Sequence, residues 1–332
     1  MSAATAIPVF CVSVAASLVT SLVFARKLDG VSERLGATEG LHGILTALGA
    51  DAPEISTAVV ALASSHGKLG VGVVIGSNVF NLAALLGLSA IVAGSVGIHR
   101  YGLLFNGGVA LAVAGIGTAL VLGALGAVGA TLLLLAVLGP YVFLLSVSPG
   151  RLRRVLPRGP VERFVVAAVR EEIVDMRTGE EVPKATFGDV LALAPSLAVI
   201  VGASIGMVGA ATDLGRHWGV SDVVIGTLVL ASLTSLPNLL TAVRLALHGR
   251  GAAVVSEALN SNSLNILFGL AIPALAVTLG SRTGLETFAV WWLVGMTVVA
   301  VTLAYTRHGL TRPEGAAIVA LYAAFVAVVA VR

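Results

Sequence analysis

Residues 47–81, ALGADAPEISTAVVALASSHGKLGVGVVIGSNVFN, recur in altered form at residues 231–265 as ASLTSLPNLLTAVRLALHGRGAAVVSEALNSNSLN. A shift of 184 positions aligns the two stretches without a gap. The first copy has these identical partners in the second at that shift: Ala47, Pro53, Thr57, Ala58, Val59, Gly67, Val71, Ser77, Asn78 and Asn81. Proline and buried polar residues are costly in an apolar helix, so their recurrence indicates an internal repeat.

Composition indicates that the chain lies in a membrane. Apolar residues make up 57% of the 332 residues and charged residues 11%, whereas a soluble domain has about 25% charged residues. Apolar runs long enough to cross a bilayer occur at residues 6–24, 38–64, 69–94, 101–121, 126–147, 187–214, 219–246, 252–278, 285–305 and 313–331. We therefore expect about ten transmembrane helices.

The distribution of basic residues predicts the orientation. No basic residue precedes the first apolar run, and Arg26 and Lys27 follow it, which is the reverse of the charge order of a cleavable signal peptide. An external N-terminus places sixteen of the twenty Lys and Arg on the cytoplasmic side, eight of them between Arg151 and Lys184. The sequence thus predicts a multi-pass plasma-membrane protein, and its positive charge reports topology rather than nucleic-acid binding.

Five predicted spans lie in each half of the chain, and five is an odd number. The second copy therefore enters the membrane from the other side, which predicts an all-α polytopic protein of two inverted five-helix repeats. The predicted divisions are residues 1–147, a linker at 148–186, and residues 187–332. We expect a solvated cytoplasmic linker; the alternative is a regulatory ion-binding loop, but its acids lack the spacing of a calcium loop.

Each repeat is expected to contain a broken helix. Pro53 lacks an N–H and should free the carbonyl of Gly49, and Pro237 should do the same for Leu233. Free carbonyls are tolerated in a membrane only where they are buried in protein or line a polar cavity. We therefore expect both carbonyls to face a site between the repeats.

Polar side chains gather around these breaks and in the following helices. Asp51 and Glu54 are three residues apart and share a helical face. Further oxygen-bearing residues at corresponding positions are Thr234, Ser235, Asn238, Ser77, Asn81, Ser261 and Asn265. A set of carboxylate, amide, hydroxyl and carbonyl oxygens without histidine or sulfur is typical of a site for a hard cation such as Ca²⁺ or Na⁺.

These motifs carry a resemblance to a known family. Pro-Glu at 53–54, followed by Gly-Ser-Asn-x-Phe-Asn at 76–81 and repeated once in altered form, resembles the alpha repeats of the calcium/cation antiporter superfamily, which includes the sodium/calcium exchangers. The resemblance places the first alpha motif at 47–91 and the second at 219–275. It implies a cation exchanger with alternating access.

The resemblance also implies roles for single residues. It identifies Glu54 as the metal-binding glutamate of the first repeat. It assigns ligand positions to Ser77, Asn81, Thr234, Ser235 and Ser261. The chain departs from the family pattern at Asp51, at Asn238, where a second glutamate is expected, and at Asn265, where some relatives have aspartate.

The predicted function is export of Ca²⁺ in exchange for Na⁺ or H⁺. Both expected carboxylates come from one repeat, and their combined charge of −2 balances one divalent ion or two sodium ions. Because two neighbouring acids repel, proton coupling competes with sodium coupling. No cofactor is expected, and the predicted partners are the bilayer and inorganic cations, with no nucleic acid and no evident protein partner.

Three alternatives remain open from the sequence. The chain could be a non-transporting member of the same fold, or it could exchange another cation, such as Mg²⁺, Mn²⁺ or Na⁺ against H⁺. Gly202-Ala-Ser204-Ile-Gly206 also matches the Gly-x-Ser-x-Gly pattern of serine hydrolases. It lies inside an apolar span rather than on a strand-to-helix turn, so an intramembrane hydrolase is disfavoured.

Overall fold

The computed structural model describes residues 1–36, 39–176, 185–280 and 283–331. Its first half is built almost entirely from helices. Their bounds are α1 Ala3–Arg34, α2 Glu39–Ala50, α3 Ala52–Ala63, α4 Gly67–Asn81, the π-helical η1 Leu82–Leu88, α5 Ser89–Ala93, α6 Arg100–Val121 and α7 Ala127–Leu145. Two further helices follow in the predicted linker, α8 Pro149–Val155 and α9 Pro160–Met176.

The second half repeats this order. Its helices are α10 Phe187–Trp218, α11 Asp222–Val224, the π-helical η2 Ile225–Leu230, α12 Ala231–Thr234, α13 Leu236–Leu247, α14 Gly251–Leu264, the π-helical η3 Asn265–Ala271, the 3₁₀ turn η4 Pro273–Leu275, α15 Gly284–Thr306 and α16 Arg312–Val331. Adding 184 to the bounds of α1 reproduces those of α10, and the same shift takes α3 onto α13. The repeat seen in the sequence around two helices therefore extends over the whole membrane part.

The number of predicted spans is confirmed. Among the described residues, eight helices are long and apolar enough to cross a membrane, and two bent pairs raise the number to ten. The bent pairs are residues 41–63, with a bend of 56°, and residues 222–247, with a bend of 46°. Several spans are longer than expected, because α1 and α10 continue past the apolar runs at 6–24 and 187–214.

The two bends have the same cause. Pro53 and Pro237 each stand at the second position of the new helix, where the missing N–H costs no intrahelical bond. The breaks therefore fall at Asp51 and Ser235, two residues before each proline. The broken helices expected from the sequence are thus present, and each consists of two helices that end and restart at the break.

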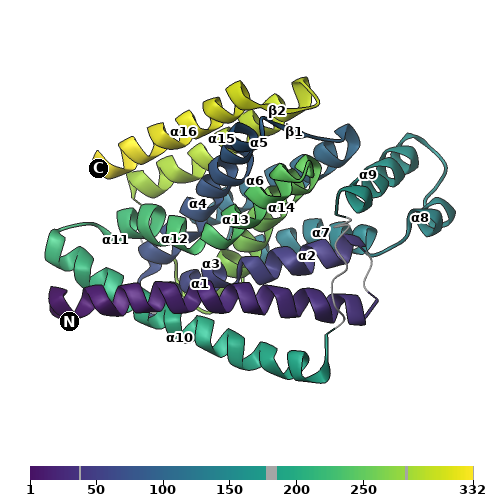
Figure 1. Cartoon of the computed structure of the whole chain (residues 1–332). Helices are drawn as coiled ribbons and strands as arrows, with labels where there is room; N and C mark the ends of the chain where they lie inside the picture. The colour runs from purple at the N-terminus through teal and green to yellow at the C-terminus, as the bar shows by residue number, and fades with distance from the viewer. Residues whose placement is uncertain (37–38, 177–184, 281–282, 332) are drawn as a thin grey trace.

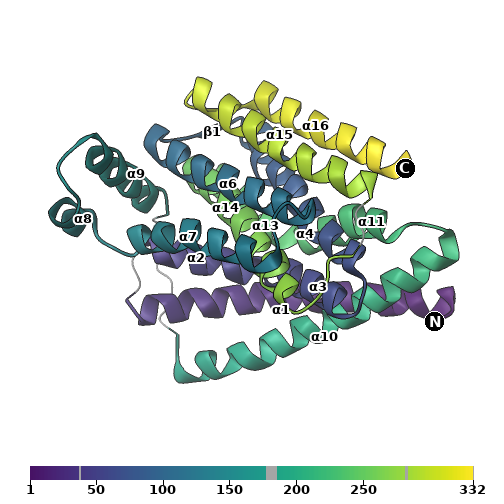
Figure 2. The same cartoon turned by 180° about the vertical axis from the view of Figure 1, so that it is seen from behind.

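The two halves are inverted relative to each other. The equivalent helices α1 and α10 lie side by side and run in opposite directions (Figures 1 and 2). The N-terminal amine donates to Asp213 at 2.6 Å, and Lys27 pairs with Asp189 at 2.7 Å, so the start of each helix meets the end of the other. Antiparallel packing of equivalent helices confirms the predicted inverted repeat.

A pair of reciprocal hydrogen bonds marks the pseudo-twofold axis. The Asn78 amide donates to the carbonyl of Asn262, and the Asn262 amide donates to the carbonyl of Asn78, both at 3.0 Å. These residues are 184 positions apart and belong to α4 and α14, which are the central, enclosed helices. The axis therefore passes between α4 and α14.

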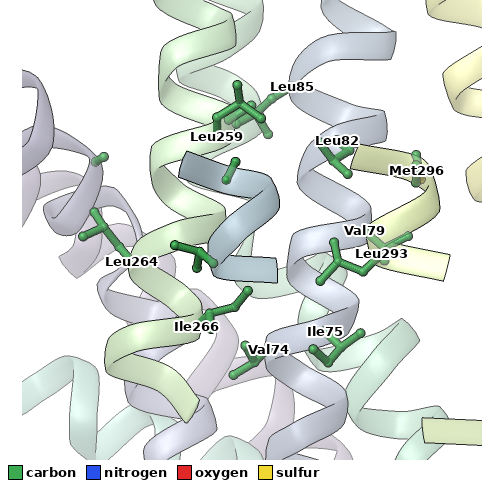
Figure 3. Packing of buried hydrophobic residues seen from close by; sticks show 14 of the residues in the cluster. Val74, Ile75, Val79, Leu82, Leu85, Leu259, Leu264, Ile266, Leu293 and Met296 are labelled. Atoms are coloured by element: carbon green, nitrogen blue, oxygen red, sulfur yellow. The ribbon is translucent and has the colours of Figure 1, made fainter. Parts of the chain in front are cut away.

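The apolar core surrounds these two helices. Figure 3 shows Leu85 facing Leu259 of α14 on one side of the α4–η1 segment, while Val79 and Leu82 face Met296 of α15 on the other. Leu82, Leu85 and Val79 are fully buried. Packing on both sides fixes α4 between the second-repeat helices and holds its polar residues at the centre.

A small sheet joins two connections between membrane helices. Strand β1, Ser95–Gly97, pairs antiparallel with β2, Gly309–Thr311, and Val96 lies opposite Leu310. Both of these side chains are fully buried. The sheet ties the turn after α5 to the turn before α16.

The linker differs most from its prediction. Residues 177–184 lie outside the described part, but α9 packs against the bundle rather than standing free in solvent. Val166, Val169 and Glu172 are buried, and the ring of Phe164 meets that of Tyr101 edge-on at 6.0 Å. The expectation of a solvated segment is wrong for α9, because its apolar face finds a partner in α6.

Helices α8 and α9 lie at the end of the bundle away from both chain termini (Figures 1 and 2). We call this end, together with the neighbouring ends of α1, α6 and α14, the basic end. It carries basic residues from five segments, including Lys27, Arg34, Arg100, Arg153 and Arg250.

Candidate functional site

The helix break in the first repeat positions two buried carboxylates. Asp51 occupies the break itself, and Glu54 follows one turn later in α3. Their side chains are 0% and 2% exposed. Among the described residues, no Lys, Arg or His forms an ion pair with either of them. Their charge is thus left to be balanced by something other than the protein's own cations.

Asn238 of the second repeat bridges both carboxylates. Its amide nitrogen donates to Asp51 Oδ1 at 2.7 Å and to Glu54 Oε1 at 2.8 Å. Asn238 is the residue that the 184-position shift pairs with Glu54. The pseudo-twofold axis therefore brings the amide of one repeat against the acids of the other.

The partner helices complete this network. Ser261 donates to Asp51 Oδ1 at 2.6 Å, and Asn265 donates to Glu54 Oε2. Asn81 in turn donates to Ser261 Oγ at 3.1 Å. Residues from α3, α4, α13 and α14 or its continuation thus meet at one buried point.

The same side chains leave a set of buried oxygens without a hydrogen bond among the described residues. They are Asp51 Oδ2, Ser77 Oγ, Asn81 Oδ1, Asn238 Oδ1 and Asn265 Oδ1. Buried polar atoms are almost always satisfied, since an unpaired one costs about 1–3 kcal/mol. Asn238 and Asn265 point their amide nitrogens at the carboxylates, and Asn81 points its nitrogen at Ser261 Oγ, so the three amide oxygens are left for another partner.

This donor set suits a hard cation. Carboxylate, amide and hydroxyl oxygens are the ligands that Ca²⁺ and Na⁺ use in proteins. The described residues contain no group of three His, Cys, Asp or Glu close enough to hold a metal ion. Any ion held here would therefore depend on two carboxylates and neutral oxygens.

The hydroxyls of Thr234 and Ser235 donate elsewhere. Thr234 donates to the Leu230 carbonyl and Ser235 to the Ala231 carbonyl, each at 2.8 Å, within their own helix. Ser235 still lies beside the Glu54 carboxylate, as does Ser77. The hydroxyl oxygens of Ser77, Thr234 and Ser235 can accept a hydrogen bond or coordinate an ion. The hydroxyl protons of Thr234 and Ser235 already have acceptors within their own helix.

The two backbone positions join the site less directly. Gly49 packs against α1, where an added Cβ would lie 3.1 Å from the Cα of Ala25. For the described residues, no contact joins the carbonyl of Gly49 or Leu233 to Asp51 or Glu54. Both stay predictions as ligands.

Sequence reasoning missed two features around the site. The reciprocal pair of Asn78 and Asn262 was visible as an identical match, but its role in joining α4 to α14 depends on the fold. The second feature is Glu172 of α9, which is fully buried and accepts hydrogen bonds from Asn106 at 2.6 Å and Ser256 at 2.8 Å. No local signal separates this glutamate from the solvated acids of the linker.

Ser204 does not form a hydrolase site. The Ser204 hydroxyl in α10 lies 3.2 Å from the Thr57 hydroxyl in α3, which is hydrogen-bonding distance. Both side chains are fully buried. A serine nucleophile needs a neighbouring base, and the described hydrogen bonds of Ser204 include none. The pair instead fastens α10 to α3.

Comparison with known proteins identifies the family of this architecture. The family model described as "Sodium/calcium exchanger protein" matches residues 5–155 and 189–331. Sodium/potassium/calcium exchanger 3 of Rattus norvegicus is 34% identical over 99 residues, which are 29% of this chain and 16% of that protein. Inner membrane protein YrbG of Escherichia coli (strain K12) is 28% identical over 233 residues, covering 70% of this chain and 67% of that protein. The chain thus matches only about a sixth of the length of the first of these relatives.

Solved structures share the fold. The sodium-calcium exchanger NCX_Mj, soaked with Na⁺ and Sr²⁺, superimposes with a TM-score of 0.63 at 21% identity, covering 98% of both chains. The H⁺/Ca²⁺ exchanger CAX superimposes with a TM-score of 0.71 at 14% identity, covering 96% of this chain and 81% of that chain. At these identities the likeness concerns the fold alone.

Proposed function

Because the chain belongs to the sodium/calcium exchanger protein family, we propose that it is a secondary antiporter that moves Ca²⁺ across the membrane in exchange for Na⁺ or H⁺. The observation that carries the proposal is the buried pair of Asp51 and Glu54, which no basic side chain neutralises and which Asn238 bridges from the other repeat. A site with this charge and these oxygens attracts a hard cation. The family is one of transporters, so no catalytic residue is assigned.

The proposed ligands include every oxygen-bearing residue that we expected from the sequence. They are Glu54, Asp51, Asn81, Ser77, Asn238, Asn265, Ser261, Thr234 and Ser235, with the backbone carbonyls of Gly49 and Leu233. The carboxylates and the unpartnered amide oxygens of Asn81, Asn238 and Asn265 support the core of this set. Thr234, Ser235 and the two carbonyls are its outer members.

The asparagine amides suit the site both without and with a bound cation. With their nitrogens turned inward, Asn238 and Asn265 donate to Asp51 and Glu54, which stabilises the acids without a cation. With their oxygens turned inward, the same groups add neutral ligands to a bound ion, since an asparagine side chain offers both a donor and an acceptor. Such a site holds its shape through loading and unloading.

The charge of the site sets the exchange ratio that we propose. Asp51 and Glu54 together carry −2 when ionised, which one Ca²⁺ balances, as do two Na⁺ or two H⁺. The second repeat adds no carboxylate at the corresponding positions, because Asn238 and Asn265 are neutral. We therefore propose one divalent ion against two monovalent ions, which moves no net charge.

Alternating access follows from the inverted halves. Two halves related by a pseudo-twofold axis can exchange conformations and so open the same site to either side in turn. We place the halves at residues 1–147 and 187–332, with the linker at 148–186. We also propose a plasma-membrane location with the N-terminus outside and the basic end, with α8 and α9, in the cytoplasm.

The direct test is radiocalcium flux in proteoliposomes. Sodium and proton gradients are imposed separately on purified protein, so that the gradient that drives uptake names the coupling ion. Glu54→Gln and Asp51→Asn each remove one charge while keeping the side-chain shape, and each should reduce Ca²⁺ flux by at least tenfold, the effect of about 1.4 kcal/mol lost from a charge that faces a divalent ion.

A matched control separates the site from a general effect of charge. Glu33→Gln makes the same substitution on an exposed residue of α1 and should leave the flux unchanged. Absence of Ca²⁺ flux in the wild-type protein under both gradients, with the protein correctly inserted, would contradict the proposal.

The neutral residues of the second repeat favour one second candidate, exchange of another cation. Asn238 and Asn265 make the site less acidic than a four-carboxylate or three-carboxylate cage would be, which weakens its preference for a divalent ion. Competition of the flux by Mg²⁺ and Mn²⁺, and a Na⁺/H⁺ exchange assay without Ca²⁺, distinguish this candidate from the first.

A further inference from the structure

A third buried carboxylate lies outside the proposed ligand set. Glu257 of α14 stands one helical turn before Ser261, which bonds Asp51. Both Glu257 carboxylate oxygens are buried, and neither has a hydrogen-bond partner among the described residues. A membrane-embedded acid without a partner is costly, and such residues usually belong to an ion path.

Three charged groups act on Glu257. They belong to Asp51 of the central site, to Asp29 near the end of α1, and to Arg250 at the start of α14. Along α14, Glu257 stands between Arg250 at the basic end and Ser261 at the central site.

Further polar groups lie around Asp29 on α1 and α2. Asp29 accepts a hydrogen bond from Thr46 of α2 at 2.5 Å, and His42 lies close enough to act on the charge of Asp29. His42 Nδ1 is also buried without a partner among the described residues. Helix α2 leads directly to the break at Asp51, so these groups follow the same route to the central site.

The opposite half of the molecule has no counterpart of Glu257. The 184-position shift pairs Glu257 with Val73 and pairs His42 and Thr46 with Gly226 and Leu230. It pairs Asp29 with Asp213, whose carboxylate accepts a hydrogen bond from the N-terminal amine. Val73 and Leu230 are fully buried and apolar. The pseudo-twofold axis thus relates Glu257, on the side of the basic end, to a buried valine on the other side.

We propose that Glu257 is a separate cation-binding position, which holds a partly hydrated divalent cation between the basic end and the central site formed by Asp51 and Glu54. The proposal rests on the proposed transport function. It adds a second binding position for the ion, which lies only on the side of the basic end. In this proposal Glu257 attracts the ion through its own charge, and the ion keeps part of its water shell.

The position makes the two sides of the transporter kinetically unequal. A cation that arrives from the basic end meets Glu257 first, and the negative charge raises its local concentration before it reaches the central site. A cation that arrives from the opposite side meets Val73 in the position equivalent to Glu257. The half-saturating Ca²⁺ concentration should therefore be lower on the side of the basic end.

The test compares wild-type protein and Glu257→Gln in vesicles of both orientations. Half-saturating Ca²⁺ is measured for flux from each side, with Ca²⁺ itself as the probe. At the basic end the substitution should raise that concentration about tenfold, as expected for the loss of one charge facing a divalent ion. On the other side it should change little.

The conservative variant Glu257→Asp serves as the second measurement. It keeps the charge on a shorter side chain and should give an intermediate change on the same side, and it also serves if Glu257→Gln does not fold. Equal changes on both sides would indicate a purely structural role and overturn the inference, as would no change on either. Failure of the wild-type protein to transport under either gradient overturns the proposed function and this inference together.

Discussion

Asn238→Asp is the substitution that tests the charge balance of the site most directly. The side chain keeps its shape, but the nitrogen that donates to Asp51 at 2.7 Å and to Glu54 at 2.8 Å becomes an oxygen that can only accept. Two favourable contacts become two contacts between carboxylate oxygens. The charge of the site changes from −2 to −3 when all three groups are ionised.

The magnitude follows from these two contacts. Each hydrogen bond to a charged acceptor contributes about 1.5–3 kcal/mol, and two unit charges about 4 Å apart at an effective dielectric constant of about 20 repel by roughly 4 kcal/mol. Relaxation and counter-ions reduce the sum, so we expect a net destabilisation of the cation-free protein by roughly 3–5 kcal/mol. Ca²⁺ replaces the repulsion by attraction and should restore most of this loss.

The assay is thermal unfolding of the purified protein with and without Ca²⁺. Wild-type protein should gain stability on adding Ca²⁺, and Asn238→Asp should start lower and gain more. Asn106→Asp is the matched control, because Asn106 also donates to a buried carboxylate, that of Glu172 at 2.6 Å, but outside the central site. The control should lose stability in the same way without recovering it in Ca²⁺.

A second readout concerns the exchange ratio. A site of charge −3 can be balanced by three monovalent ions, so flux through Asn238→Asp should respond to an imposed membrane potential. An equal Ca²⁺-dependent gain in stability in wild type and Asn238→Asp would refute the reasoning, because it would place position 238 outside the reach of the ion.

Three further predictions follow from the same structure. Wild-type Ca²⁺ flux should not change when a potassium diffusion potential is imposed with an ionophore, since one divalent ion against two monovalent ions moves no net charge; a steep voltage dependence would contradict the proposed ratio. Gly76→Ala should lower stability by about 1–3 kcal/mol in thermal unfolding, because its Cβ would lie 2.3 Å from the Thr227 carbonyl oxygen, whereas Gly129→Ala, with nothing within 4 Å, should have little effect; equal effects would count against close packing of α4 on η2. Glu172→Gln should destabilise the docking of α9, leaving Asn106 and Ser256 with a weaker acceptor, and should increase proteolysis of the linker with no change in Ca²⁺-induced stabilisation; unchanged proteolysis would show that other contacts hold α9.

Much of the membrane architecture could be predicted from the sequence because it depends on local properties. Apolar runs of bilayer length predicted the ten spans, and an odd number of spans per half predicted the inversion. Proline at 53 and 237 predicted broken helices, and the breaks fall at Asp51 and Ser235, so that each proline stands in the first turn of a new helix. The polar residues of the site were visible because polar side chains are rare in apolar spans.

The partners of those polar residues depended on the tertiary structure. Nothing local in the sequence says that Asn238 turns its amide to Asp51 and Glu54, which are 187 and 184 residues away. The reciprocal bonds of Asn78 and Asn262 likewise form only once α4 and α14 cross at the axis. Distances of this kind are set by the packing of whole helices.

The linker shows most clearly what could not be predicted from the sequence. By composition Glu172 belongs to a charged, solvated segment, yet it is fully buried because Asn106 of α6 and Ser256 of α14 supply hydrogen bonds that replace water. Length, hydropathy and repetition by themselves determined that the chain crosses the membrane as two opposed halves. Which side chains meet was decided only by the folded protein, because a buried polar group is stable only where distant segments bring it a partner.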